Sequence, residues 1–253
     1  MYGTVTSATA FMTSGGEICD ELLHGMSFRV IENLGGKFHI ETDYGYRGDI
    51  SERDVILHDD DRNSEDLRMV SGMFADVLYA PSVRSGIIIT LVRGCAVRLI
   101  GGDENGFSLI ELAGGARGYI RSVILSEAKN DDRENNEHAL RKSILNSAAA
   151  YTGTQYRWGG KSPMGIDCSG LCFMAYRENG ITVYRDAILK PGYALRQIPR
   201  EQMKPADLAF LLGHVAMYAG GGTFIHSSVR NNGVKADRLE GYDLDEIIIG
   251  SAF

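Results

Sequence analysis

A chain of 253 residues that is 44% hydrophobic and 23% charged has the composition of an ordinary globular protein and is long enough for two or three small domains. Its net charge of -7 disfavours nucleic acids and anionic membranes as partners, because both bind clusters of Lys and Arg. No basic leader precedes an apolar run, and no stretch reaches the roughly 18 apolar residues of a membrane span. Four cysteines in no dense pattern suit a reducing compartment, so we expect a cytoplasmic protein with no membrane association.

The first half of the chain carries an internal repeat. Residues 23–31 (LHGMSFRVI) align with residues 92–100 (VRGCAVRLI), and residues 47–50 (RGDI) align with residues 117–120 (RGYI). Short apolar runs between glycine and polar turns are typical of small strands. Tandem copies of this kind predict two small all-β domains, at residues 1–58 and 67–126. We expect a charged linker at residues 59–66 and a short helix at residues 67–74.

The second half predicts a domain of a different class. The polar segment at residues 126–137 predicts an exposed linker. After it, Leu140, Ile144 and Ala148 recur at helical spacing and predict an amphipathic helix that opens a third domain at residues 137–253. Helices followed by a hairpin-rich sheet predict an α+β architecture for this domain.

A cysteine stands at the predicted start of the next helix. Residues 156–165 contain two consecutive glycines and a proline, which predict irregular backbone. Asp167 is a favoured N-cap residue, and the apolar residues after it recur at helical spacing until Asn179 and Gly180. Cys168 therefore begins a helix, where the macrodipole is expected to lower its pKa and favour the nucleophilic thiolate. Cys172, one turn later, is expected to be an ordinary buried cysteine.

Two histidines lie in a predicted β-hairpin nearer the C-terminus. Two strand-like runs flank the three glycines at residues 220–222. If the turn is centred near Gly220, His214 and His226 are cross-strand neighbours with Cβ atoms roughly 5 Å apart. One imidazole can then orient the other, as a nucleophilic cysteine with a base requires.

These motifs carry a resemblance to a known family. Their order is YxWGG at residues 156–160, DCSGL at 167–171, GHV at 213–215 and FIH at 224–226. This order resembles that of the NlpC/P60 family of papain-like cysteine peptidases, which cut peptides of bacterial cell walls. The two repeats are similar to bacterial SH3-like (SH3b) modules. The expected fold is therefore multi-domain, with two small SH3-like barrels before a papain-like α+β catalytic domain.

The resemblance implies a reaction and three catalytic roles. Cys168 would be the nucleophile, His214 the base that takes its proton, and His226 the residue that orients His214. The implied reaction is hydrolysis of the bond between γ-D-Glu and an L-diamino acid, diaminopimelate or Lys, in a free muropeptide. It needs no cofactor and no metal, and it would serve the recycling of cell-wall peptides. The sequence leaves the choice of diamino acid and the oligomeric state open.

The resemblance also implies substrate-binding residues. Relatives with SH3b modules require an unblocked N-terminal L-Ala, whose ammonium is bound by an acidic residue beside the nucleophile and by a tyrosine of the first module. Asp167 and Tyr46 match these positions, whereas the second repeat has Ala116 in place of Tyr46. The other expected site residues are Tyr156 as an oxyanion donor, Trp158 as an apolar wall, Ser169 as a hydroxyl donor, and Asp186.

Three other interpretations are possible from the residues. Cys168, Cys172, His214 and His226 could bind zinc, but the two histidines are twelve residues apart, whereas structural zinc fingers space them by about 3 to 5. A binding module without activity would not need the complete set of Cys168, His214 and His226. An acyltransferase or amidase on the same scaffold would use the same residues for a different acyl transfer.

Overall fold

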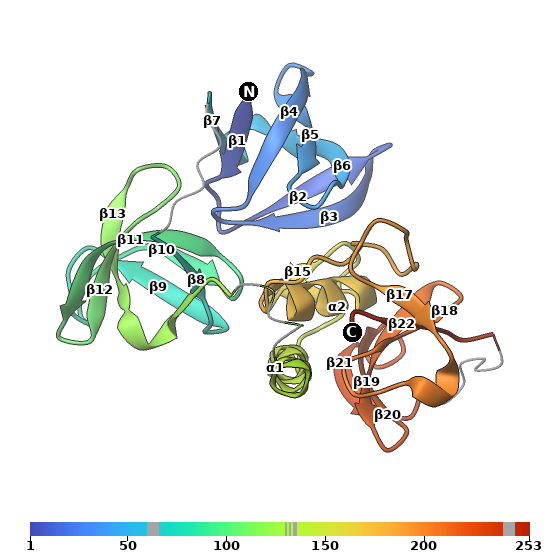
Figure 1. The fold of residues 1–253 in the computed structure, drawn as a ribbon. Helices are drawn as coiled ribbons and strands as arrows, with labels where there is room; N and C mark the ends of the chain where they lie inside the picture. The colour runs from blue at the N-terminus through green and yellow to red at the C-terminus, as the bar shows by residue number, and fades with distance from the viewer. Residues whose placement is uncertain (60–65, 130, 132, 134–135, 240–245) are drawn as a thin grey trace. The chain divides into compact units, whose positions relative to one another are not determined.

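The chain divides into two compact units. The computed structural model describes residues 1–59, 66–129, 131, 133, 136–239 and 246–253. The first unit is Met1–Ala128 and the second is Lys129–Phe253 (Figure 1). Most of the linker predicted between the two repeats lies outside the described residues.

The first unit contains fourteen strands in two sheets of seven. The first sheet consists of β1 (Tyr2–Val5), β2 (Thr9–Ser14), β3 (Glu17–Leu23), β4 (Ser27–Asn33), β5 (Lys37–Thr42), β6 (Arg47–Ser51) and β7 (Val55–His58). The second consists of β8 (Leu67–Val70), β9 (Phe74–Leu78), β10 (Ile87–Val92), β11 (Ala96–Glu104), β12 (Phe107–Glu111), β13 (Arg117–Arg121) and β14 (Leu125–Glu127). A short 3-10 helix precedes the last strand of each sheet, at Glu52–Asp54 and Ser122–Ile124.

The two sheets have the same topology. Their strand orders are β3-β2-β6-β5-β4-β1-β7 and β10-β9-β13-β12-β11-β8-β14, which coincide when each strand of the first copy is matched to the strand seven later. Tyr46 and Ala116 also occupy equivalent turns, since their carbonyls accept from Thr42 N–H and Leu112 N–H. The two segments of the sequence repeat therefore form sheets of one strand order. Between the described strands, the pairing does not join the outer strands of either sheet into a closed barrel.

The short helix expected at residues 67–74 is wrong. These residues form β8 and the start of β9, because β8 pairs with both β11 and β14 and is an inner strand of its sheet. Val70 is fully buried there. Pairing with strands distant in sequence therefore outweighs the local pattern, as is usual for short segments.

His24 links the two copies within the first unit. The ring is buried, and its Nδ1 lies 2.9 Å from the carbonyl oxygen of Thr6, so Nδ1 carries the hydrogen. Its Nε2 then accepts a hydrogen bond from the backbone N–H of Ala113 in the second copy, at 3.1 Å. Gly25 lies against the same junction, where a Cβ would stand 2.2 Å from the carbonyl oxygen of Ala96. The junction thus requires a neutral imidazole and a glycine.

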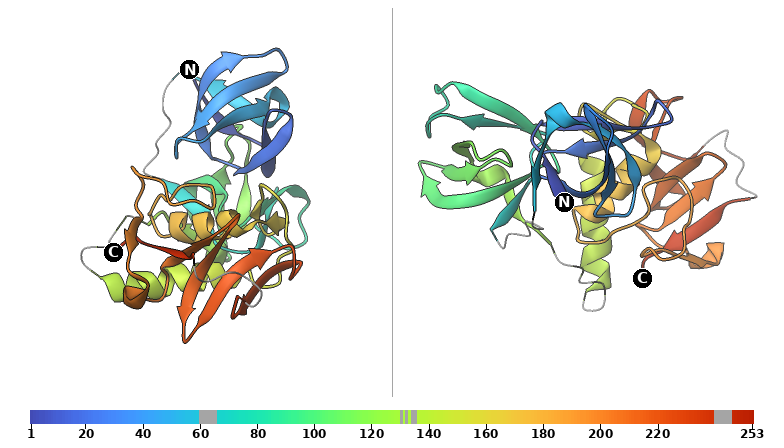
Figure 2. Two further views of the ribbon diagram at one scale, coloured as in Figure 1. Left: turned by 90° about the vertical axis from the view of Figure 1, so that its right-hand side faces the viewer. Right: turned by 90° about the horizontal axis from the view of Figure 1, so that it is seen from above.

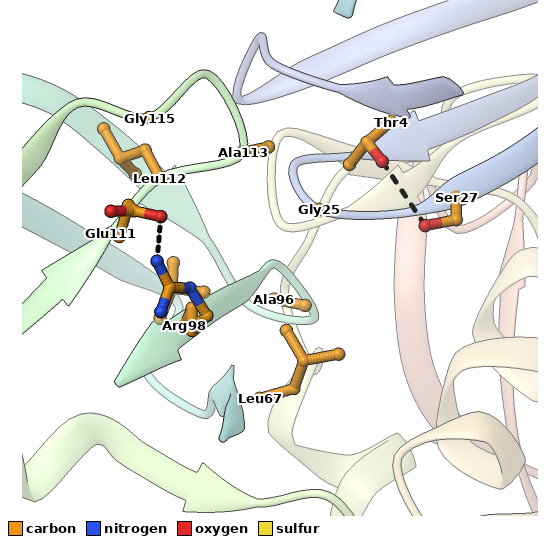
Figure 3. A pocket seen from close by; sticks show the side chains of 11 residues that line it. Thr4, Gly25, Ser27, Leu67, Ala96, Arg98, Glu111, Leu112, Ala113 and Gly115 are labelled. Carbon is orange, nitrogen blue, oxygen red and sulfur yellow. Dashed lines mark hydrogen bonds and ion pairs between the residues drawn. The ribbon is translucent and has the colours of Figure 1, made fainter. Parts of the chain in front are cut away.

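A pocket of about 110 Å³ lies beside this junction. Figure 3 shows Thr4, which is hydrogen-bonded to Ser27, on one side of the pocket, and the ion pair of Arg98 with Glu111 on the other side. The remaining lining residues are Gly25, Leu67, Ala96, Val97, Leu112, Ala113 and Gly115.

The second unit combines two helices with a six-stranded antiparallel sheet. The helices are α1 (Glu137–Ala150) and α2 (Cys168–Arg177). The sheet order is β17-β22-β18-β19-β20-β21, and β15 (Lys161–Ser162) pairs with β16 (Gly165–Ile166) in a separate small hairpin. The sheet strands are β17 (Arg196–Ile198), β18 (Leu208–Leu211), β19 (His214–Gly220), β20 (Thr223–Ser228), β21 (Gly233–Asp237) and β22 (Ile248–Ser251), with a 3-10 helix at Arg200–Gln202.

Helix α2 is the centre of this unit. It packs against α1 on one side and against β19 and β20 on the other (Figure 2). Its residues from Cys168 to Tyr176 are all buried, which fits a helix covered on every side. Both predicted helices are confirmed, with Leu140, Ile144 and Ala148 on the buried face of α1. Within the described part of the chain, no helix is long and apolar enough to cross a membrane.

The His24 junction makes the stability of the first unit sensitive to acid. Burial is the main reason why the pKa of His24 is lowered. The unfolded chain therefore binds a proton at a pH where the folded chain does not, and the free energy of unfolding falls as the pH drops below the ordinary histidine value of about 6.5. We expect the His24→Gln variant to lose this part of the pH dependence between pH 7.5 and 5. Urea unfolding of both proteins at each pH measures it, and equal slopes would contradict the assignment.

Candidate active site

Cys168 occupies the first position of α2, as predicted. The Asp167 carboxylate caps the helix by accepting from the backbone N–H of Gly170 at 2.6 Å. The Cys168 side chain is buried, and its sulfur accepts hydrogen bonds from the backbone N–H groups of Val215 and Ser169. Val215 directly follows His214, so the thiol lies beside the start of β19. The fold brings the predicted nucleophile and the predicted base into one place.

The pKa of Cys168 differs from the expectation. Burial, followed by the charge of the adjacent Asp167 carboxylate, raises it to about 11, against smaller lowering effects of the two N–H groups and Arg185. The position at the helix start is correct, but the sulfur lies under protein atoms and beside a negative charge. A thiol is therefore the stable form in the resting protein. Cys172 is buried in the core, as expected.

His214 and His226 are in direct contact. Nε2 of His214 lies 2.8 Å from Nδ1 of His226, and the rings meet edge to face with centroids 5.0 Å apart. Burial, with a smaller contribution from His226, lowers the pKa of His214 to about 4. His214 is thus a neutral imidazole at neutral pH, which is the form that can accept a proton.

The predicted register of the histidine hairpin is wrong by two residues. Met217 pairs with Ile225 and Gly220 with Thr223, so the turn is centred at residues 221 and 222 rather than near Gly220. In this register Ala216 stands opposite His226, and His214 is its diagonal neighbour. Diagonal positions about 7–8 Å apart lie within reach of two imidazoles, so the contact forms despite the shift.

Asp237 extends the chain of contacts, and sequence reasoning missed it. Its Oδ1 lies 2.9 Å from Nε2 of His226, and its Oδ2 accepts from the side-chain amide of Asn231 at 2.9 Å. β21 pairs with β20 so that Lys235 stands opposite His226, which makes Asp237 another diagonal neighbour of that histidine. An acidic residue at the end of the strand after the hairpin is the signal that could have identified it.

Arg185 is the second residue that the sequence analysis missed. Its side chain is 1% exposed and forms an ion pair with Asp167, with one nitrogen 3.1 Å from each carboxylate oxygen. It also donates to the hydroxyl of Ser169 at 2.8 Å. The sequence analysis assigned no role to Arg185, because nothing in the sequence shows that this side chain is buried. A buried arginine needs a carboxylate partner, and here that partner is Asp167.

The Asp167 carboxylate accepts hydrogen bonds from several neighbouring groups. It accepts from the backbone N–H groups of Gly159 and Gly170, from the Ser169 hydroxyl and from both terminal nitrogens of Arg185. A carboxylate offers about four acceptor sites, so these five contacts fill it. The structure also explains Gly170, because a Cβ there would stand 2.2 Å from the carbonyl oxygen of Gly160.

The other predicted binding residues lie in different surroundings. Ser169 is buried beside Asp167, whereas Trp158 is 67% exposed. Tyr156 is half-buried and forms an isolated bridge with Ile166 at the base of the loop. Asp186 is half-buried and shares a side-chain hydrogen bond with Tyr184. Tyr46 belongs to the first unit, in the turn before β6.

A metal centre finds no support in the arrangement of these side chains. No group of three or more His, Cys, Asp and Glu residues within the described ranges has the geometry to hold a metal ion. His226 has one ring nitrogen against His214 and the other against Asp237, and Cys172 lies in the core.

Comparison with known proteins gives consistent matches. The model of the NlpC/P60 family matches residues 153–249. The chain is 38% identical over 231 residues to dipeptidyl-peptidase 6 of Lysinibacillus sphaericus, and the alignment covers 88% of this chain and 85% of that protein. It is 31% identical over 135 residues to the gamma-D-glutamyl-L-lysine dipeptidyl-peptidase of Bacillus subtilis, covering 49% of this chain and 42% of that one.

A solved structure shares the fold. The crystal structure of an NlpC/P60 family protein from Bacillus cereus superposes with a TM-score of 0.80, and the match covers 98% of each chain at 16% sequence identity. At this identity the comparison bears on the fold alone.

The two shifted pKa values predict how Cys168 reacts with an alkylating agent. A thiol with a pKa of about 11 beside an imidazole with a pKa of about 4 stays uncharged at neutral pH. The rate of Cys168 alkylation by iodoacetamide should therefore rise steadily from pH 6 to pH 9, because only the thiolate reacts. The peptide that contains Cys168 also contains Cys172, so tandem mass spectrometry is used to locate the modified residue and to separate Cys168 from the other three cysteines. A fast, pH-independent rate down to pH 6 that disappears in His214→Ala would contradict this and indicate a resting ion pair.

The Asp167–Arg185 pair predicts a strong energetic coupling. Removing one partner leaves the other charge buried, so Asp167→Asn and Arg185→Met should each lower the free energy of unfolding by about 3–5 kcal/mol. Asparagine still caps the helix, so the loss in that variant comes from the charge. The double variant should lose much less than the sum of the two. Chemical denaturation measures all three, with Arg238→Met at an exposed position as the control. Additive losses would show that the pair is not coupled.

Proposed function

The chain belongs to the NlpC/P60 family, and on that premise we propose that it hydrolyses the bond between γ-D-Glu and an L-diamino acid in free peptidoglycan stem peptides. The observation that carries the proposal is the hydrogen-bonded pair of His214 and His226 beside Cys168 at the start of a buried helix. Two relatives named for dipeptidyl-peptidase activity, one of them on γ-D-glutamyl-L-lysine, support the choice of bond. The diamino acid is diaminopimelate or Lys.

The proposed reaction begins with an uncharged pair. His214 takes the thiol proton as the sulfur of Cys168 attacks the γ-carbonyl carbon of D-Glu, so proton transfer and attack proceed together. A tetrahedral intermediate forms, and its oxyanion is met by backbone N–H at the start of α2 and by the Tyr156 hydroxyl. The imidazolium then gives its proton to the amine of the diamino acid, which leaves as the C–N bond breaks.

The second half of the reaction releases the dipeptide. Water attacks the thioester carbonyl while His214 takes a proton from the water molecule. The C–S bond breaks, the thiol is restored with that proton, and L-Ala-γ-D-Glu leaves as a free acid. The neutral state of His214 suits both halves, since each begins with an imidazole that accepts a proton.

The same proposal assigns an architecture to the chain. Residues 1–58 and 67–126 would be SH3b-like domains, and residues 137–253 a papain-like α+β catalytic domain. The shared strand order of the two repeats supports the first assignment, and the packing of α2 on the sheet supports the second.

Recognition of the substrate would require a free N-terminal amine. Asp167 would bind the ammonium of L-Ala, with the hydroxyl of Tyr46 as a further partner. Because the Asp167 carboxylate is already filled, one contact must give way, and the Ser169 hydroxyl is the one that can rotate to the substrate. Ser169 would then bind the D-Glu carboxylate or backbone, with Trp158 as an apolar wall and Asp186 as a further polar contact.

The proposed setting is the cytoplasm, where peptides freed from the wall are broken down. A requirement for an unblocked amine favours short released peptides over stem peptides that are still linked to glycan. The partner of the protein is then a small peptide.

The proposal predicts a defined cleavage. The protein should release L-Ala-γ-D-Glu from L-Ala-γ-D-Glu-diaminopimelate or from its Lys counterpart, as followed by mass spectrometry. Cys168→Ala should abolish release, and His214→Ala should reduce it by about 10²-fold or more, because a general base is lost. Cys19→Ser, which changes a cysteine of the first unit, should leave the rate unchanged.

The N-acetylated tripeptide tests the second part of the proposal. Blocking the amine should remove cleavage, and equal cleavage of both peptides would contradict the roles of Asp167 and Tyr46 while keeping the peptidase. A wild-type protein that binds the tripeptide without cutting it would point to a binding module. Transfer of the acyl group to an added amine in preference to water would point to an acyltransferase.

A further inference from the structure

The two catalytic histidines belong to a longer chain of hydrogen bonds that ends in a carboxylate. His214 Nε2 faces His226 Nδ1 at 2.8 Å, and His226 Nε2 faces Asp237 Oδ1 at 2.9 Å. The three residues lie on the adjacent strands β19, β20 and β21. Asn231 holds the second oxygen of Asp237 through its side-chain amide.

The carboxylate determines where each hydrogen lies. An ionised Asp237 only accepts, so His226 Nε2 must carry a hydrogen and donate it. In a neutral His226, Nδ1 is then an acceptor, and it can accept only from a hydrogen on His214 Nε2. His214 Nδ1 consequently carries no hydrogen, and its lone pair is the one that can accept a proton. The hydrogen bonds from Asp237 through His226 to His214 thus select one tautomer for each ring.

A competing contact exists at His226 and is weaker. The side-chain nitrogen of Asn231 lies 3.4 Å from His226 Nε2, and a hydrogen bond there would reverse both tautomers. That nitrogen lies closer to Asp237 Oδ2, at 2.9 Å. A short bond to an ionised oxygen is stronger than a long bond to a neutral nitrogen, so the amide hydrogen belongs to Asp237.

We infer that Asp237 is a positioning residue that fixes the tautomers of His226 and His214 and so leaves His214 with its Nδ1 lone pair as the base. This inference rests on the proposed function for its catalytic consequence, but the tautomers themselves are a property of the resting protein. It extends the predicted set of Cys168, His214 and His226 by one residue on the next strand.

Burial makes the carboxylate necessary. The side chain of His226 is 2% exposed, so water cannot replace a lost partner without entering the site, whereas Asp237 is 39% exposed. The Asp237 charge also raises the pKa of His214, against the larger effects of burial and of His226. Asp237 therefore favours the imidazolium that forms when Cys168 loses its proton.

The first experiment reads the tautomers directly. Long-range ¹H–¹⁵N correlation spectra of the protein with ¹⁵N-labelled histidine distinguish a protonated from an unprotonated ring nitrogen. His214→Gln and His226→Gln variants assign the two signals among the six histidines. We expect hydrogen on Nε2 and none on Nδ1 in both rings at pH 7. Hydrogen on Nδ1 of His226, alone or together with Nε2, would overturn the inference.

The second experiment removes the carboxylate. Asp237→Ala should produce mixed tautomers in both rings and lower kcat by about tenfold or more, a part of what a general base contributes, with KM nearly unchanged. Asp237→Glu, which retains the carboxylate, should recover much of the rate. The matched control is Lys235→Ala, an exposed position on the same strand directly opposite His226, which should change neither the spectra nor kcat.

The two proposals fail in different ways. If the wild-type protein cuts no stem peptide, the proposed function fails, while the histidine spectra and the alkylation rate of Cys168 in Asp237→Ala still test the positioning role. If the wild-type protein is active and Asp237→Ala keeps both its spectra and its kcat, the positioning role is wrong and the peptidase stands. A loss of kcat that Asp237→Glu does not recover, with unchanged tautomers, would likewise reject it.

Discussion

The buried ion pair between Asp167 and Arg185 is the contact on which the active site depends. It joins three segments: the glycine-rich loop through Gly159, the start of α2, and the segment that carries Arg185. Each charge is nearly inaccessible to water, so either one alone would be strongly destabilising. Cys168 directly follows Asp167, so the pair helps to hold Cys168 in place at the start of α2.

The arrangement of Asp167 and Arg185 around the start of α2 affects the pKa of the Cys168 thiol. The N-terminus of a helix favours a thiolate, but the same helix start here carries a carboxylate and is covered by β19, so the pKa of Cys168 rises to about 11. In the proposed reaction, activation would then come from His214, whose pKa of about 4 keeps it uncharged and able to accept a proton. Removal of the thiol proton in this reaction would depend on His214 and its contacts with His226 and Asp237, not on the N-terminus of α2.

Local patterns in the sequence predicted the parts of the structure that depend on near neighbours. The helix begins at Cys168 because Asp167 caps it and apolar residues follow at helical spacing, and the repeat reappears as two sheets of one topology. The errors concern contacts through space. Residues 67–74 form strands because distant strands pair with them, and the hairpin turn shifts because three successive glycines admit more than one register. Arg185 and Asp237 act through partners 18 and 11 residues away, which spacing alone does not identify.

His24 and His226 share one feature: in each ring, a fixed hydrogen-bond acceptor holds the hydrogen on one nitrogen. His24 donates from Nδ1 to a backbone carbonyl, and Asp237 accepts from Nε2 of His226, so each ring has one nitrogen left as an acceptor. The difference lies in what that nitrogen meets. At His24 it accepts from the amide of Ala113, which cannot release its hydrogen, and the result is a rigid junction. At His226 it faces Nε2 of His214, and under the proposed tautomers the other nitrogen of His214 would be the oriented base. Under the proposed function, the fixed acceptor at His226 would have a catalytic effect because its chain of contacts ends in a histidine that can accept a proton, whereas the chain at His24 ends in a backbone amide.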